Sequence, residues 1–231
     1  MNTRIEKIAK NVLQENEISY DEAHFLIQTS GNEIYDLLYW ANRIRYNSFN
    51  NVVSLCSIIS ARQGSCSEDC RFCSQSSRYK TEISNFPLIE KEKVAEAVEK
   101  GKEYKSDCVG VVTSGYSLEG SDNFDKICDD AYELSKQDGP PVHTSIGMIT
   151  SKMAEKLASS GVEMINHNLE TSESYYPNIC TTHSYKDRVD TIKVAKNAGL
   201  QVCSGGIFGV GESIDDRLDL AFKLKDLDVD T

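Results

Sequence analysis

Strand and helix patterns alternate regularly in this sequence from Val52 onward. Short apolar runs lie at residues 52–59, 108–112, 142–146, 164–166 and 201–203, and stretches with helical periodicity lie at 90–104, 123–136, 151–159, 185–197 and 214–227. Short apolar runs are typical of strands, and a repeat of three to four residues is typical of amphipathic helices. Gly161 and Gly199 stand just before an expected strand, where helix C-caps belong. The alternation predicts a parallel sheet with right-handed helical crossovers.

Polar motifs follow the carboxyl ends of these expected strands. A loop with three cysteines follows the first, and Thr113-Ser-Gly, Asn166-His-Asn-Leu-Glu-Thr171 and Cys203-Ser-Gly-Gly follow later ones. Strand carboxyl ends form the functional face of a β/α barrel. An open doubly wound sheet also binds ligands there, but the chain lacks the early glycine fingerprint of that fold. We interpret the glycines of Gly206-Ile-Phe-Gly-Val-Gly211 as letting the backbone approach a ligand closely.

Five strand–helix units occupy the chain up to residue 227, whereas a complete barrel has eight. We therefore predict an α/β fold with about five units of a TIM-type (β/α)8 barrel in residues 51–231. An open sheet of this kind leaves an unpaired edge, so we expect a piece of a longer protein or a partner that covers the edge. With 231 residues and 39% hydrophobic content, the chain can build one sizeable core.

Residues 1–50 are expected to form a helical extension ahead of the barrel. Ile5, Ile8 and Val12 recur at helical spacing with charges between them. Ser19-Tyr-Asp-Glu22 has the form of a capping box and opens a second short helix. Apolar residues from Ile34 to Ile44 indicate a third helix. The sequence therefore predicts two domains, at residues 1–50 and 51–231.

Three cysteines follow the first expected strand with C-x₃-C-x₂-C spacing, at Cys66, Cys70 and Cys73. Thiolates this close on a short loop can converge on one metal centre, and soft sulfur ligands select iron–sulfur clusters or zinc. A zinc ribbon needs a second cysteine pair, and none follows. Three ligands are one too few for a closed zinc site or a fully ligated cubane, so one metal keeps an open position.

Composition and charge restrict the partners and the cellular location that we expect for a protein with such a metal centre. The formal net charge of −11 argues against nucleic acid or an anionic membrane surface as a partner, because both favour basic patches. No apolar run reaches the ~18 residues of a membrane span. The amino-terminal residues carry no apolar signal segment. We therefore expect a cytoplasmic protein whose 8 cysteines are reduced.

The motifs resemble those of a known family. The cysteine triplet with Phe72 before its last member resembles the cluster loop of radical S-adenosylmethionine (SAM) enzymes. Four segments together resemble biotin synthases: residues 66–79, the NHNLET of 166–171, the YPNICTT of 176–182 and the CSGGIFGVGE of 203–212. The resemblance runs from about Val52 to Asp226. Related hydrogenase-maturation and pyrrolysine-pathway enzymes share the first loop but not the later pair of motifs.

The resemblance implies a sulfurtransferase that converts dethiobiotin to biotin. In that family a [4Fe–4S] cluster reduces SAM, the resulting 5′-deoxyadenosyl radical takes hydrogen from two unactivated carbons, and an auxiliary [2Fe–2S] cluster supplies sulfur. A saturated C–H bond offers nothing to acid–base catalysis, so a cofactor must carry this step. The resemblance also implies a flavodoxin- or ferredoxin-type reductant and a homodimer in the full-length protein.

Residue roles are carried over by position in the motifs. Cys66, Cys70 and Cys73 match the ligands of the radical cluster. Glu170 matches an aspartate at the SAM ribose, and either carboxylate can accept a hydroxyl hydrogen bond. Asn168 matches a residue that contacts substrate, although it could be a turn residue at a strand end. Arg188 matches an arginine near the SAM carboxylate, although its helix position also suits a solvated charge.

At the ligands of the auxiliary cluster, this sequence departs from the family. Cys108 and Cys203 match two of the three cysteines that the family uses. His143 stands where the third is expected, and imidazole can replace thiolate on iron. Cys180 is the alternative, which we favour because thiolate binds iron more strongly than neutral imidazole does. The family's arginine ligand would lie beyond Thr231.

The remaining candidates receive ordinary roles. Cys56 and Cys128 are expected to be buried cysteines without a metal, and His167 is expected to be structural or to support other site residues. Two further functions stay open: another radical SAM enzyme with a different small substrate, and a chain that binds a cluster but catalyses nothing.

Overall fold

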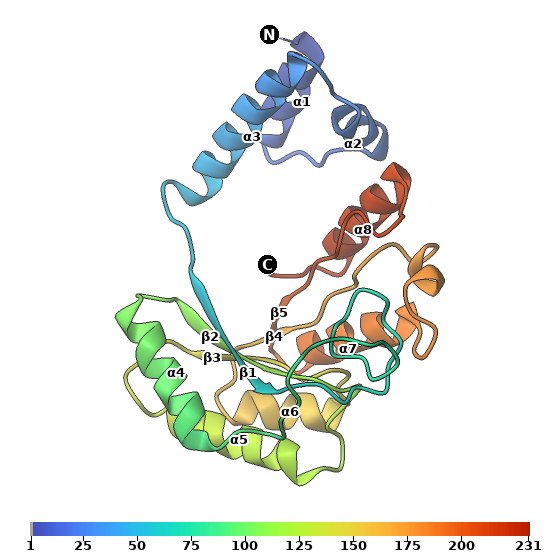
Figure 1. Ribbon diagram of the computed structural model, residues 1–231. Helices are drawn as coiled ribbons and strands as arrows, with labels where there is room; N and C mark the ends of the chain where they lie inside the picture. The colour runs from blue at the N-terminus through green and yellow to red at the C-terminus, as the bar shows by residue number, and fades with distance from the viewer. Residues whose placement is uncertain (1) are drawn as a thin grey trace. The chain divides into compact units, whose positions relative to one another are not determined.

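The computed structural model describes residues 2–231, which divide into two compact units (Figure 1). The first unit comprises residues 2–54 with Ser213–Leu218, and the second comprises Leu55–Glu212 with Asp219–Thr231. The domain boundary predicted between residues 50 and 51 stays a prediction. No helix in the described part of the chain is long and apolar enough to cross a membrane.

The first unit contains three helices, as the sequence predicts: α1 (Thr3–Val12), α2 (Tyr20–Ile27) and α3 (Glu33–Phe49). Asn2 caps α1, because its side chain accepts hydrogen bonds from two backbone N–H groups of the first turn. Ser19 and Glu22 form the predicted capping box of α2. Ile5 and Trp40 are buried where α1 and α3 pack together.

The second unit contains a five-stranded parallel sheet. Its strands are β1 (Cys56–Arg62), β2 (Cys108–Thr113), β3 (Val142–Ser145), β4 (Met164–Asn166) and β5 (Gln201–Cys203). The helices that follow them are α4 (Lys91–Glu103), α5 (Asp122–Leu134), α6 (Ser151–Ser159), α7 (Tyr185–Asn197) and α8 (Ile214–Asp226), with a 3₁₀ turn at Tyr176–Asn178. Gly161 and Gly199 adopt φ of 79° and 81°, as expected for residues that end a helix.

The first strand is the one element whose predicted position was wrong by several residues. We expected it at 52–59, but β1 begins at Cys56. Val52 and Val53 are exposed and precede the sheet. The backbone of Leu55 is the first to meet the neighbouring strand segment, where it exchanges hydrogen bonds with Asp107. Apolar character alone therefore predicts the wrong start for the first strand, because pairing with β2 determines where β1 begins.

Strand order decides between the two candidate architectures. The order is β1-β2-β3-β4-β5, with every neighbouring pair parallel. A doubly wound sheet reverses its strand order and covers both faces with helices, whereas a barrel keeps the order sequential and places its helices on one side. Figure 1 shows α4, α5 and α6 on one side of the sheet, and α6 is followed by its neighbour α7. The predicted barrel-type α/β fold, with five units present, is confirmed.

The two faces of the sheet carry different residues. Val109, Ile165 and Val202 are buried in the core against the helices. Successive side chains of a strand point to opposite faces, and partners in register share a face. Cys56 pairs with Cys108, Gly110 with His143, His143 with Met164, and Asn166 with Cys203. The register therefore puts Cys56, Cys108, His143, Asn166 and Cys203 on one face, which we call the inner face.

Candidate functional site

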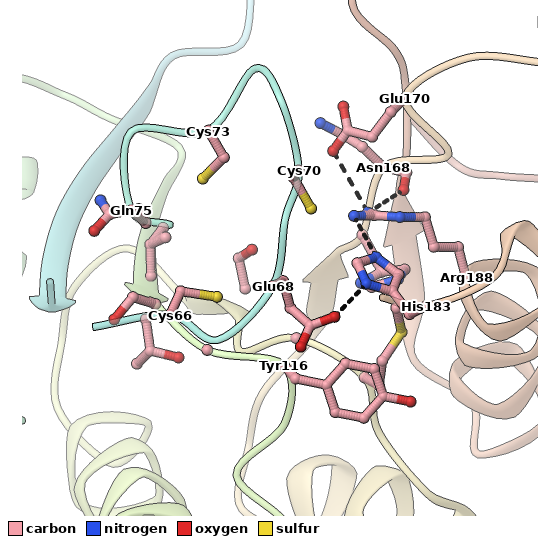
Figure 2. Close-up of a pocket in the computed structure, with 18 of the residues that line it drawn as sticks. Cys66, Glu68, Cys70, Cys73, Gln75, Tyr116, Asn168, Glu170, His183 and Arg188 are labelled. Atoms are coloured by element: carbon pink, nitrogen blue, oxygen red, sulfur yellow. Dashed lines mark hydrogen bonds and ion pairs between the residues drawn. The ribbon is translucent and has the colours of Figure 1, made fainter. Parts of the chain in front are cut away.

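A cavity of about 260 Å³ lies at the carboxyl ends of the strands. It is lined by the loop after β1, the ends of β2, β3 and β4, and side chains from the segment that leads into α7 (Figure 2). Six residues predicted from the sequence line this one cavity: Cys66, Cys70, Cys73, Asn168, Glu170 and Arg188. The structure thus brings together the cysteine triplet and the three residues that were assigned to SAM or substrate.

Backbone hydrogen bonds shape the loop that carries the three cysteines. The N–H of Cys66 donates to the carbonyl of Gln75 at 3.1 Å, and its carbonyl accepts from the N–H of Ser77 at 2.8 Å. Cys66 and Cys70 are buried, and Cys73 is half-buried. Figure 2 shows the three cysteines on one loop, with Cys70 on the side of Arg188. The loop therefore presents its thiols to the cavity from a fixed backbone.

Asp69 joins the cysteine loop to the segment after β4. Its carboxylate accepts hydrogen bonds from the backbone N–H groups of Thr181 and Thr182 at 2.8 and 3.2 Å, and from both hydroxyl groups. The Thr181 hydroxyl is the main reason that the pKa of Asp69 lies well below its usual range; burial opposes the shift, and the two backbone donors add to it. The sequence shows both motifs but gives no sign that they are tied together.

Arg188 is the centre of a buried hydrogen-bond network. Its Nε donates to the Tyr176 hydroxyl at 2.6 Å, and Nη1 donates to the Asn168 carbonyl at 2.8 Å. Nη1 also lies 3.5 Å from Oε1 of Glu170. Only 9% of Arg188 is exposed, so the alternative of a solvated helix charge is wrong. A guanidinium suits this position because its donors have a fixed, planar arrangement.

His183 extends the network to the cysteine loop. Its Nε2 accepts from Nη2 of Arg188 at 3.1 Å, which leaves Nδ1 to donate to the Glu68 carboxylate at 2.7 Å. Burial lowers the pKa of His183, although the hydrogen bond to Glu68 opposes this, so the ring is neutral near pH 7. Burial alone would raise the pKa of Glu68, but hydrogen bonds from Thr182 and His183 lower it. Sequence reasoning missed Glu68 and His183.

Glu170 is buried beside Arg188 with one oxygen free to accept. Its Oε2 has no hydrogen-bond partner in the described chain, and burial raises the pKa of the carboxyl, which the charge of Arg188 partly offsets. The backbone of Glu170 has φ of 71° and pairs with Gly206. A Cβ on Gly206 would lie 2.6 Å from the Glu170 carbonyl oxygen. The lack of a side chain at Gly206 therefore lets its backbone approach the backbone of Glu170, whereas the sequence predicted close approach to a ligand.

Two further buried polar atoms without partners belong to residues that line the same cavity. Asn166 and His167 line the cavity, and Oδ1 of Asn166 and Nε2 of His167 find no hydrogen bond among the described residues. Burial lowers the pKa of His167 to about 3, so its ring is neutral. Unpaired buried polar atoms are costly and rare. Together with Oε2 of Glu170, they indicate that the cavity receives a polar ligand. His167, for which the sequence predicts a structural or supporting role, lines the site.

Cys180 lies beside the cysteine loop. Its sulfur is 3.7 Å from that of Cys70 and 3.3 Å from Nδ1 of His183, and donor atoms of the three residues all lie within 4.8 Å of one another. Burial and the neighbouring Cys180 raise the pKa of the Cys70 thiol. The Arg71 N–H donates to the Ile179 carbonyl at 2.9 Å, which brings this segment back to the loop. These contacts argue against our preference for Cys180 as a partner of Cys108 and Cys203.

A second group of cysteines lies on the inner face. The sulfur of Cys56 is 2.9 Å from that of Cys108. Burial and the hydrogen bond to Cys56 raise the pKa of Cys108 to about 12; burial and the charge of Cys56 also raise the pKa of Cys203. Cys56 is exposed, so the expectation of a buried residue is wrong, whereas Cys128 is buried in α5 as expected. His143 lies half-buried on the same face, and burial lowers its pKa.

Comparison with known proteins gives consistent matches. The sequence profile of the Radical SAM superfamily matches residues 62–224. The chain is 38% identical to a biotin synthase of Geotalea daltonii over 231 residues, which are 100% of this chain and 70% of the relative. It is 43% identical to a biotin synthase of Clostridium tetani, over 99% of this chain and 70% of that one.

Solved structures match in fold. Methylornithine synthase superposes with a TM-score of 0.84 at 21% identity, over 96% of this chain and 65% of that chain. A maturase of the [FeFe]-hydrogenase superposes with a TM-score of 0.79 at 18% identity, over 96% of this chain and 51% of that chain. The chain therefore spans somewhat less than two thirds of the length of the first of these structures and about half of the second.

Proposed function

The chain belongs to the biotin synthase family of the Radical SAM superfamily, and we propose that its cavity binds SAM and dethiobiotin for the conversion of dethiobiotin to biotin. The observation that carries this proposal is the composition of one cavity. It combines a cysteine triplet with a buried acid–arginine pair and with acceptor atoms that lack partners. Thiols suit an iron–sulfur cluster, and the free acceptors suit a ligand rich in hydroxyl, amino or ureido N–H groups.

Membership of the family implies a [4Fe–4S] cluster, and the donor set of the loop fits one. Cys66, Cys70 and Cys73 would hold it with three thiolates and leave one iron open to the amino and carboxylate groups of SAM. A cubane holds its ligands farther apart than a single ion does, which agrees with three cysteines spread around one loop (Figure 2). When bound, this cluster supplies the electron for reductive cleavage of SAM.

Glu170 and Arg188 are proposed to bind and orient SAM. The unpartnered Oε2 of Glu170 is available to accept a hydrogen bond from a ribose hydroxyl. Arg188 holds the other carboxylate oxygen and places a buried positive charge in the cavity, where it favours the SAM carboxylate. The network through Tyr176 and His183 fixes the guanidinium, so the charge is in position before the ligand arrives.

Asn168 is proposed to position dethiobiotin. Its side chain lines the cavity, and its Oδ1 accepts from the N–H of Gly205 at 3.1 Å. That bond orients the amide so that its NH₂ group can donate to the ureido carbonyl of the substrate. The buried walls around the cavity would exclude water from the reacting carbons.

The finer parts of the family's chemistry are proposals for this chain. Cys108 and Cys203 would bind an auxiliary iron–sulfur cluster on the inner face, of the [2Fe–2S] type or a variant, which supplies sulfur. A flavodoxin- or ferredoxin-type reductant would deliver electrons, and the full-length protein would form a homodimer. The two-domain division at residue 50 belongs to the same proposal.

Anaerobic reconstitution with iron and sulfide tests the proposal. We expect a [4Fe–4S] absorption and electron paramagnetic resonance spectrum that changes when SAM is added, and production of 5′-deoxyadenosine that dethiobiotin stimulates. The Cys73→Ala variant should lose both, whereas Cys128→Ala, which alters a buried cysteine of α5, should keep them. Tight zinc binding without iron uptake would contradict the cluster assignment. SAM cleavage that dethiobiotin never stimulates would favour a radical SAM enzyme with another substrate.

A further inference from the structure

The closest pair of thiols on the inner face includes a residue to which the family resemblance gives no role. Cys56 and Cys108 open two neighbouring strands and face each other in register, with their sulfur atoms 2.9 Å apart. We propose that Cys56 is a ligand of the auxiliary iron–sulfur cluster and binds it together with Cys108 and Cys203. This inference rests on the proposed function, because the auxiliary cluster is one of its parts.

The backbone fixes the two thiols side by side. The N–H of Leu55 donates to the Asp107 carboxylate at 2.7 Å, and the N–H of Asp107 donates to the Leu55 carbonyl at 2.7 Å. This clamp stands directly before Cys56 and Cys108, so the two cysteines start their strands at the same level. Their separation is therefore set by paired strands and does not depend on a flexible loop.

Cys203 belongs to the same group through the sheet register. Cys108 and Gly110 lie two residues apart on β2 and so point to the same face, and Gly110 pairs with His143, which pairs with Met164. Asn166 lies two residues after Met164 on β4 and pairs with Cys203. Cys203 is therefore on the same face as Cys108. Three cysteines from β1, β2 and β5 thus lie on the same face of the sheet.

A metal centre accounts for this arrangement better than packing does. Free cysteines that serve as small apolar residues are buried, as Cys128 is, whereas Cys56 is an exposed residue. Two thiolates in contact repel each other unless a cation lies between them. Iron takes cysteines as thiolates and releases their protons on binding, so a cluster turns a repulsive pair into a ligand pair. Cys56 would also supply a third thiolate ligand, since His143 stands where the family has its third cysteine.

The test isolates the auxiliary cluster by first removing the radical cluster. A variant with Cys66, Cys70 and Cys73 all changed to alanine is reconstituted anaerobically, and its iron, sulfide and Mössbauer spectrum are measured. Adding Cys56→Ala to this background should lower the affinity for the remaining iron by at least ~10–100-fold. Loss of a residue that only supports a metal ligand already has an effect of that size. Cys128→Ala in the same background is the matched control and should retain the iron. Circular dichroism checks that each variant is folded.

The outcomes separate this inference from the proposed function. Retained iron with an unchanged Mössbauer spectrum in the Cys56 variant would overturn the ligand assignment and leave the auxiliary cluster in place. No iron in the triple variant, with its other cysteines intact, would overturn the auxiliary cluster itself and the inference with it. A Cys56–Cys108 disulfide that persists under reducing reconstitution, shown by thiol counting, would also overturn the assignment. Cys56→Ser supports it if the iron affinity again falls, because serine keeps the size but not the thiolate.

Discussion

The cavity at the carboxyl ends of the strands and the cysteine group on the inner face differ in how their polar groups are satisfied. In the cavity, Arg188 has protein partners on Tyr176, Asn168 and His183, and the network is buried. On the inner face, Cys56 and Cys108 have each other, and one of them is exposed. The difference teaches that the cavity satisfies its charged groups with buried protein partners before any ligand binds, whereas on the inner face strand pairing holds two thiols against each other and leaves one of the two cysteines exposed.

The largest effect is expected where the buried network is broken. Arg188→Ala would leave the Glu170 carboxylate buried without its charge partner, and such losses cost about 3–5 kcal/mol in the free energy of unfolding. Urea denaturation of the cluster-free chain measures this directly. A loss below about 1 kcal/mol would mean that the cavity is not organised by its own network. Lys186→Ala, on an exposed face of the same helix, is the control.

Glu170 should control SAM binding with a clear pH signature. Because burial raises its pKa, the carboxylate is lost as the pH falls through a value above 4.5, and SAM affinity should fall with it. Glu170→Gln removes a charged acceptor that contributes ~1.5–3 kcal/mol, a loss of about 10–100-fold in affinity. The variant should also show a flatter pH profile. Calorimetric titration of the reconstituted chain with SAM measures both, and an unchanged profile would remove Glu170 from the binding site.

A smaller effect is expected at the tie between the cysteine loop and the segment after β4. The pKa of Asp69 is lower in the folded chain than in the unfolded chain, so its stabilising contribution is present above about pH 4 and is lost as the pH falls through the folded pKa. Asp69→Asn should cost ~1–2 kcal/mol at pH 7, because Asp69 is only half-buried. The difference from wild type should shrink toward pH 2. A difference that grows on acidification would contradict this assignment.

The smallest effect is expected on the inner face when no metal is bound. Cys56 is exposed at the start of its strand, so Cys56→Ala should change the stability of the cluster-free chain by less than about 0.5 kcal/mol. The same urea denaturation that is used for Arg188→Ala measures it. A large loss would show that Cys56 is a packing residue, and the contrast between the two regions would then disappear.

Local patterns were sufficient for most of the fold. The alternation of periods predicted the five strands and their helices, because each element is encoded by residues that are neighbours in the sequence. The capping box at Ser19–Glu22 and the turns at Gly161 and Gly199 were also readable, since each is fixed within a few residues. The spacing of Cys66, Cys70 and Cys73 indicated a metal centre, and the motif at residues 166–171 brought Asn168 and Glu170 into the predicted site.

Only the tertiary structure decided which distant residues meet. The start of β1 depends on pairing with β2, and the contact between Cys56 and Cys108 follows from that register across 52 positions of sequence. Cys180 reaches Cys70 across 110 positions because the chain after β4 turns back to the cysteine loop. No local pattern encodes these approaches. They follow from how strands pair and how loops close over them, which is a property of the whole sheet.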